Sequence, residues 1–247
     1  MIGKVKGGQT TYGHVVGILM NDSTVPRIPG DPGHAQTFSF PVIYETLEGF
    51  PFEDLITLKK DHINILIQKA KRLQEKGVSL IVADCGLFGP FQRDMKEHLN
   101  VPFIGSALDM VPVLQRFLPA NQQVGIITGD TTLLKPAHLE ASGIKSGTVL
   151  IAGMENSSEF KKVVIEKGLE LDIARMRQGV VDAALSLPRK YLGAIVLECT
   201  NLISFRSDIQ KAMGVPVFDL VTVIEFYVSA LMFHPFQSGF INTHSPL

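Results

Sequence analysis

The chain carries an internal repeat that is offset by 114 positions and includes its two cysteines, Cys85 and Cys199. The first copy reads IVADCGLF and the second reads IVLECTNL. Seven identities fall within 22 ungapped positions, whereas average residue usage would give about one. The identical pairs are Ile81/Ile195, Val82/Val196, Cys85/Cys199, Phe91/Phe205, Asp94/Asp208, Val101/Val215 and Pro102/Pro216. A duplicated unit of this kind predicts two similar halves with one thiol in each.

A second match marks the start of each half. Residues 16–22 (VGILMND) and 124–130 (VGIITGD) share their first three residues and a closing aspartate. Each is typical of a buried parallel strand that ends in a polar loop. The match supports duplication of the whole unit.

Each half continues with a long segment of helical periodicity and a second apolar strand. The periodic segments are 52–76, which Gly77 should stop, and 158–186; the strands are 78–83 and 192–197. Strands that alternate with helices predict an α/β fold of parallel sheets. We therefore expect two similar α/β domains related by pseudo-twofold symmetry, with the active site in the cleft between them.

The expected domain boundaries follow from this plan. The first domain should comprise residues 1–117 together with 222–247, and the second residues 118–221. The apolar segment 221–233 is typical of a final helix that returns to the first domain. It is too short to span a bilayer and carries Glu225.

Residues 21–38 break the repeat, because their prolines and glycines exclude a regular helix. The equivalent stretch, 130–143, could hold a short helix with Pro136 near its first turn. Long irregular loops in compact domains are usually functional or mobile. This loop starts at the carboxyl end of a strand, where open α/β sheets bind ligands. Its Arg27 should either clamp a substrate carboxylate or be solvated.

Composition excludes several classes of partner and site. A formal net charge of −1 gives no reason to expect nucleic acid or an acidic membrane surface. Two cysteines without an apolar leader indicate a reducing, cytoplasmic location. Neither a close Cys or His pair with metal-ligand spacing nor a nucleotide-binding glycine motif is present. We therefore expect no metal site.

The cysteines fall where a strand ends and a helix should begin; exposed amides there favour a thiolate, whereas burial in an apolar cleft favours the thiol, so the sequence leaves the direction of the net pKa shift open. Two thiols on opposite faces of a substrate carbon could remove and return a proton, which inverts that carbon. The alternatives are two small buried apolar side chains or a disulfide. Strand alternation predicts that Asp84 and Glu198 face away from the cysteines, in structural or interface roles.

The sequence resembles the aspartate/glutamate/hydantoin racemase superfamily over nearly its whole length. The motif at residues 198–201 (ECTN) is similar to the family's second-cysteine motif, and residues 124–132 (VGIITGDTT) to its second-domain strand and threonine loop. Residues 21–23 (NDS) occupy the place of its first substrate-binding loop. The resemblance implies two α/β domains and catalysis without a cofactor. It also implies a dimer, since relatives often are dimers.

By this resemblance, Cys85 and Cys199 would be the two acid/base residues, and Ser23, Thr132 and Thr200 would bind the substrate carboxylate. The full set of expected substrate-binding residues is Asn21, Asp22, Ser23, Arg27, Gly86, Leu87, Thr131, Thr132, Thr200 and Asn201.

Two departures from the family pattern bear on the substrate. Gly86 and Leu87 follow Cys85, where amino-acid racemases of this group have Asn-Thr, and Asn201 replaces the histidine of glutamate racemases. Both disfavour aspartate and glutamate, and leave a substrate with an apolar or cyclic group, such as a hydantoin. We expect a cofactor-independent racemase or epimerase that acts on a small carboxylate or cyclic amide. The alternatives are a maleate-isomerase-like or arylmalonate-decarboxylase-like enzyme, or a non-catalytic protein that binds small acids.

Overall fold

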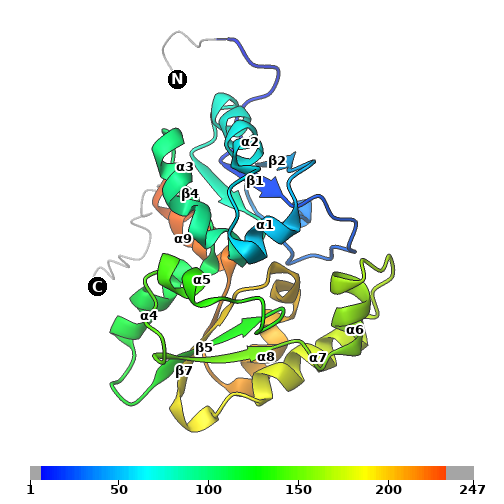
Figure 1. The fold of residues 1–247 in the computed structure, drawn as a ribbon, viewed down its shortest axis with the longest axis vertical. Helices are drawn as coiled ribbons and strands as arrows, with labels where there is room; N and C mark the ends of the chain where they lie inside the picture. The colour runs from blue at the N-terminus through cyan, green and yellow to red at the C-terminus, as the bar shows by residue number, and fades with distance from the viewer. Residues whose placement is uncertain (1–6, 232–247) are drawn as a thin grey trace, which may run out of the picture.

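The computed structural model describes residues 7–231, which form two four-stranded parallel sheets, one above the other in Figure 1. The first has the order β2 (Val42–Thr46), β1 (Val16–Met20), β3 (Leu80–Ala83), β4 (Phe103–Ile104). The second has the order β6 (Val149–Gly153), β5 (Gln123–Thr128), β7 (Leu192–Leu197), β8 (Val217–Phe218). The two orders are equivalent strand for strand, which confirms the predicted pair of similar α/β units.

Helices cover both sheets. The first unit contains α1 (Phe52–Thr57), α2 (Ile63–Glu75), α3 (Gln92–His98) and α4 (Val111–Phe117). The second contains α5 (Pro136–Ala141), α6 (Ser158–Phe160), α7 (Ile173–Leu185) and α8 (Arg206–Met213), and α9 (Leu220–Leu231) ends the described chain. Residues 232–233 of the expected final helix lie outside the described residues. Across residues 7–231, none of the helices has the length and apolar character needed to cross a membrane.

Both long helical segments are broken, so the expectation of one helix in each is wrong. In the first unit, Leu58 adopts a left-handed conformation with φ 60° and separates α1 from α2. In the second, a π-helical turn (Lys161–Ile165) follows α6, and Asp172 caps a new helix by accepting hydrogen bonds from the Ala174 and Arg175 amides. Apolar periodicity continues across both breaks, because the segments on either side of each break bury side chains in the same hydrophobic core.

Other local predictions are confirmed. The strand at 192–197 has the predicted bounds, and Gly77, with φ 80°, follows the end of α2. Within residues 21–38 a single 3-10 turn, η1 (Ala35–Thr37), interrupts irregular chain. Pro136 is the first residue of α5.

The second sheet packs on both faces. Val124, Ile126 and Val196 point toward the first unit and share its core, as does the buried face of α9. Ile195 and Leu197, one residue out of phase, instead pack with α7 and α8. Each such fully buried side chain contributes about 1.5–3 kcal/mol. The two units therefore share one continuous core, which holds their strand ends in a constant relation.

Candidate active site between the two sheets

The cysteines lie at equivalent points of the two units. Cys85 comes two residues after β3 and immediately before the 3-10 helix η2 (Gly86–Phe91). Cys199 has the same relation to β7 and the 3-10 helix η6 (Thr200–Phe205). Both have extended backbone at the N-cap position, and both are free thiols with partly buried side chains.

The two thiols share one electrostatic environment. Burial raises the pKa of Cys85 well above its ordinary value, and the carboxylate of Glu198 and the Cys199 sulfur raise it further. Burial likewise raises the pKa of Cys199, and the carboxylates of Glu198, Asp31 and Asp84 raise it further. The Leu87 amide lowers the pKa of Cys85, and the Asn201 amide lowers that of Cys199. The sulfurs thus lie within reach of each other's charge, in a site rich in carboxyl groups.

A buried ion-pair network lies beside Cys85. Arg27 donates from Nη1 to Asp31 Oδ1 at 2.6 Å and from Nη2 to Asp84 Oδ2 at 2.7 Å. Burial alone would lower the pKa of Arg27, but the two carboxylates raise it overall, so the guanidinium stays charged. Burial raises the pKa of Asp84 to about 7, and Arg27 opposes that rise.

Glu198 is the equivalent of Asp84 in the second unit and is also buried. Thr128 Oγ1 donates a hydrogen bond of 2.6 Å to Glu198 Oε2. Burial raises the pKa of Glu198 to about 7, against the opposing effects of the Thr128 hydroxyl and the Gly129 amide. Within residues 7–231, Glu198 has no Lys, Arg or His within salt-bridge distance, whereas Asp84 has Arg27. The equivalent carboxyl groups therefore differ in how their charge is balanced.

The predicted interface roles of Asp84 and Glu198 are confirmed, since Thr200 and Gly86 contact them from the opposite unit; their direction relative to the cysteines stays a prediction. The strands end at Ala83 and Leu197, one residue earlier, so strand alternation no longer decides where these side chains point. Each carboxyl group turns into the interface between the units. Asp31 and Thr128 were missed; the signal for Thr128 was its place at the carboxyl end of β5.

Four further predicted residues join this cluster. Asn21 Nδ2 and Thr200 Oγ1 donate to the Asp84 carbonyl oxygen at 3.5 and 3.4 Å. Asn201 Nδ2 donates to Asp31 Oδ2 at 3.4 Å. Gly86 touches Glu198 across the interface. Loop 21–38 and both cysteine loops therefore meet at one place.

The remaining predicted polar residues are engaged elsewhere. Asp22 is exposed, and Ser23 Oγ accepts from the Val25 amide at 3.4 Å. Thr131 is exposed and donates to Glu155, and the exposed Thr132 donates to Asp130. In this conformation the hydroxyls of Thr131 and Thr132 donate to nearby carboxylates.

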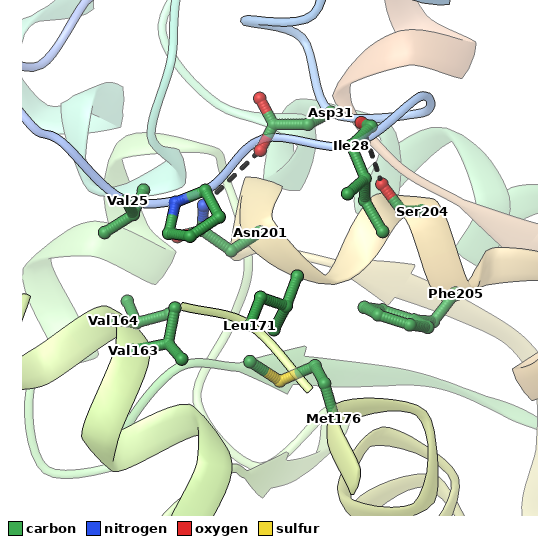
Figure 2. A pocket seen from close by; sticks show the side chains of 11 residues that line it. Val25, Ile28, Asp31, Val163, Val164, Leu171, Met176, Asn201, Ser204 and Phe205 are labelled. Atoms are coloured by element: carbon green, nitrogen blue, oxygen red, sulfur yellow. Dashed lines mark hydrogen bonds between the residues drawn. The ribbon is translucent and has the colours of Figure 1, made fainter. Parts of the chain in front are cut away.

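Loop 21–38 contacts the second unit beside a narrow apolar cavity (Figure 2). Ser204 Oγ donates to the Ile28 carbonyl oxygen at 3.4 Å, and the Asn201–Asp31 hydrogen bond closes the other side of the loop. The cavity volume is about 10 Å³, enough for about one water molecule. Its lining includes Val163 and Met176 from below and Asp31 from the loop. Across residues 7–231, no group of three His, Cys, Asp or Glu side chains could hold a metal ion.

Gly86 allows the close approach of the two units. A Cβ at this position would lie 2.5 Å from the Glu198 backbone oxygen and closer still to its Oε1. We expect Gly86→Ala to lower the free energy of unfolding by about 1–3 kcal/mol, because the added methyl forces the units apart. Gly7→Ala, with no atom within 4 Å of its added carbon, is the matched control. Urea unfolding of both variants measures the difference, and equal stability would contradict this account of the contact.

A family model described as Asp/Glu/Hydantoin racemase matches residues 34–224. A dimethylsulfoniopropionate lyase from Durusdinium sp. clade D is 27% identical over 94% of this chain and 79% of its own length. Dimethylsulfoniopropionate lyase 5 from Emiliania huxleyi is 26% identical over 89% of this chain, which spans only 46% of that relative.

A solved glutamate racemase from Bacillus anthracis shares the fold. Its TM-score is 0.57 at 16% identity, with 88% of this chain and 81% of that chain covered.

Proposed function

Because the chain belongs to the Asp/Glu/hydantoin racemase family, we propose that it removes a proton from the carbon next to the carboxylate of a small acid. The thiol of Cys85 or Cys199 takes that proton. The observation that carries this proposal is the convergence of both cysteine loops on a shared interface, where each thiol responds to the same carboxyl group, Glu198.

The reaction we favour is elimination of a positively charged leaving group, such as the sulfonium named in the lyase relatives. Of the three buried carboxyl groups here, Asp31 and Asp84 share the guanidinium of Arg27, while Glu198 has no cationic partner within residues 7–231. When all are ionised, the site has an excess of negative charge. A substrate with one cationic group would offset that excess, and its charge would lower the pKa of a nearby thiol.

The electrons and atoms of this elimination balance without an oxidant or a reductant. The thiolate takes the proton next to the carboxylate, and the C–H electron pair becomes a carbon–carbon double bond. The bond from the neighbouring carbon to the sulfonium sulfur breaks, and sulfur leaves with that pair as a neutral dialkyl sulfide. The products are an unsaturated acid and a protonated thiol, which returns its proton to water.

Racemisation is the second candidate, and the repeat itself favours it. A one-base elimination needs a single thiol, whereas inversion uses one on each face of the carbon. Cys85 and Cys199 occupy equivalent places in the two units, as a two-base reaction requires.

A direct assay separates the two reactions. We expect the purified chain to convert dimethylsulfoniopropionate to dimethyl sulfide, measured by gas chromatography, with one equivalent of unsaturated acid measured by NMR. The same enzyme is incubated in D2O with single enantiomers of amino acids and hydantoins. Deuterium uptake with inversion, and no sulfide, would select racemisation. If the enzyme releases no sulfide and takes up no deuterium, proton abstraction is refuted as its activity.

A further inference from the structure

Glu198 and Asp84 each have one buried carboxyl oxygen without a hydrogen-bond partner, but the other oxygen of Asp84 accepts from Arg27, whereas that of Glu198 accepts from a hydroxyl. Glu198 Oε2 accepts from Thr128, but its Oε1 is buried and has no hydrogen-bond partner in the structure. A buried carboxylate oxygen without a partner is costly, and protonation is the usual response. Its environment therefore favours a carboxyl group that gains and loses a proton in the neutral range.

The place of Glu198 connects it to both thiols. It precedes Cys199 in the chain, and across the interface its side chain touches Gly86, the residue after Cys85. Thr128 and Gly129, at the end of β5, contact it from a third element. The two cysteines share this site with Glu198, and the Asp84 and Asp31 carboxylates also act on them, Asp84 on both thiols and Asp31 on Cys199.

We infer that Glu198 is a positioning residue that sets the acidity of both cysteines and shares a single proton with them. With one negative charge in the cluster, either Glu198 is ionised and the thiols are neutral, or Glu198 is protonated and one thiol is ionised. Two such groups titrate as a unit and not separately. The proton leaves Glu198 first as pH rises, and its negative charge then opposes ionisation of the thiols.

The pKa shifts agree with this arrangement in direction. After burial, Glu198 is the largest cause of the raised pKa of Cys85 and also of Cys199. Asp84 contributes less to both, as expected for a carboxylate paired with Arg27.

Glu198→Gln tests the inference, because it removes the charge and keeps an oxygen that can accept from Thr128. The chain has two cysteines, so the pH dependence of the rate of thiol alkylation reports on them alone. Iodoacetamide labelling of Cys85→Ser and Cys199→Ser backgrounds then assigns each signal. We expect the midpoint pH of thiolate formation to fall by about one pH unit or more for both cysteines in Glu198→Gln.

Thr128→Val is the second variant. Loss of its hydroxyl donor raises the pKa of Glu198, but Glu198 is still ionised at the higher pH where the thiols ionise, so the thiol midpoints should stay close to those of the unmodified protein. Glu140→Gln, which removes an exposed carboxylate, is the charge-matched control and should change neither midpoint. Thermal melts measure the folded fraction of each variant, and the thiol midpoints are compared at equal folded fraction.

The outcomes are decisive without any substrate, so they stand apart from the proposed reaction. Lower midpoints for both cysteines support the shared proton. Unchanged midpoints in a folded Glu198→Gln, or a change at Cys199 alone, would overturn it. If Glu198→Gln fails to fold, the titration of Glu198→Ala, which also removes the charge, decides in the same way.

Discussion

Replacing a cysteine that acts as the base or acid with serine is expected to lower kcat by about 10²–10⁴-fold, the usual contribution of such a group. A serine hydroxyl has nearly the volume of a thiol but does not ionise in the range where enzymes work. The measurement is steady-state turnover of Cys85→Ser and Cys199→Ser on the substrate identified by the sulfide and deuterium assays. Thermal melts show whether each variant folds.

The pattern of losses distinguishes the two candidate reactions. Racemisation requires both thiols, so both variants should lose nearly all inversion. Elimination uses one base, so one variant should lose turnover while the other mainly raises KM. Full activity in both folded variants would refute any mechanism based on the thiols.

Replacing Arg27 with methionine should lower the free energy of unfolding by about 3–5 kcal/mol, the usual cost of leaving a buried charge without its partner. Asp31 and Asp84 each accept from this guanidinium, and both side chains are nearly inaccessible, at 4% and 2% exposure. Urea unfolding at pH 7 measures the effect. The loss should shrink at lower pH, because protonation of Asp84, whose pKa is about 7, removes one of the uncompensated charges.

Two further variants make this test specific. Arg93→Met removes an arginine that is 90% exposed and should change stability by no more than about 0.5 kcal/mol. Adding Asp84→Asn to Arg27→Met should recover part of the loss, since the uncompensated carboxylate is then neutral. No recovery would show that Arg27 stabilises the loop by packing and not by its charge.

The repeat made the fold predictable from sequence. Two copies of an apolar strand followed by cysteine predict two α/β units of the same topology, and the strand orders of the two parallel sheets are equivalent. The breaks at Leu58 and before Asp172 were hidden, because apolar spacing reports which face is buried and not whether the helix is continuous.

The site was only partly predictable. Cys85 and Cys199 could be identified because they follow the carboxyl ends of β3 and β7, and all parallel strands of a sheet end at the same edge. Asp31 accepts from Asn201 and Thr128 donates to Glu198, and both contacts join segments far apart in the sequence, which no local pattern records. Arg27 illustrates the same limit: sequence places it in the loop, but its two carboxylate partners are set by tertiary packing.

Asp84 pairs with Arg27, whereas its equivalent Glu198 pairs with Thr128. This difference has an evolutionary consequence. An assembly of two identical subunits must accept every substitution twice, once on each side of its axis. A single polypeptide that carries both copies is free of that constraint and can change one side alone. Here one side pairs its buried carboxyl group with an arginine and the other with a threonine hydroxyl, an asymmetry unavailable to a homodimer built from either half.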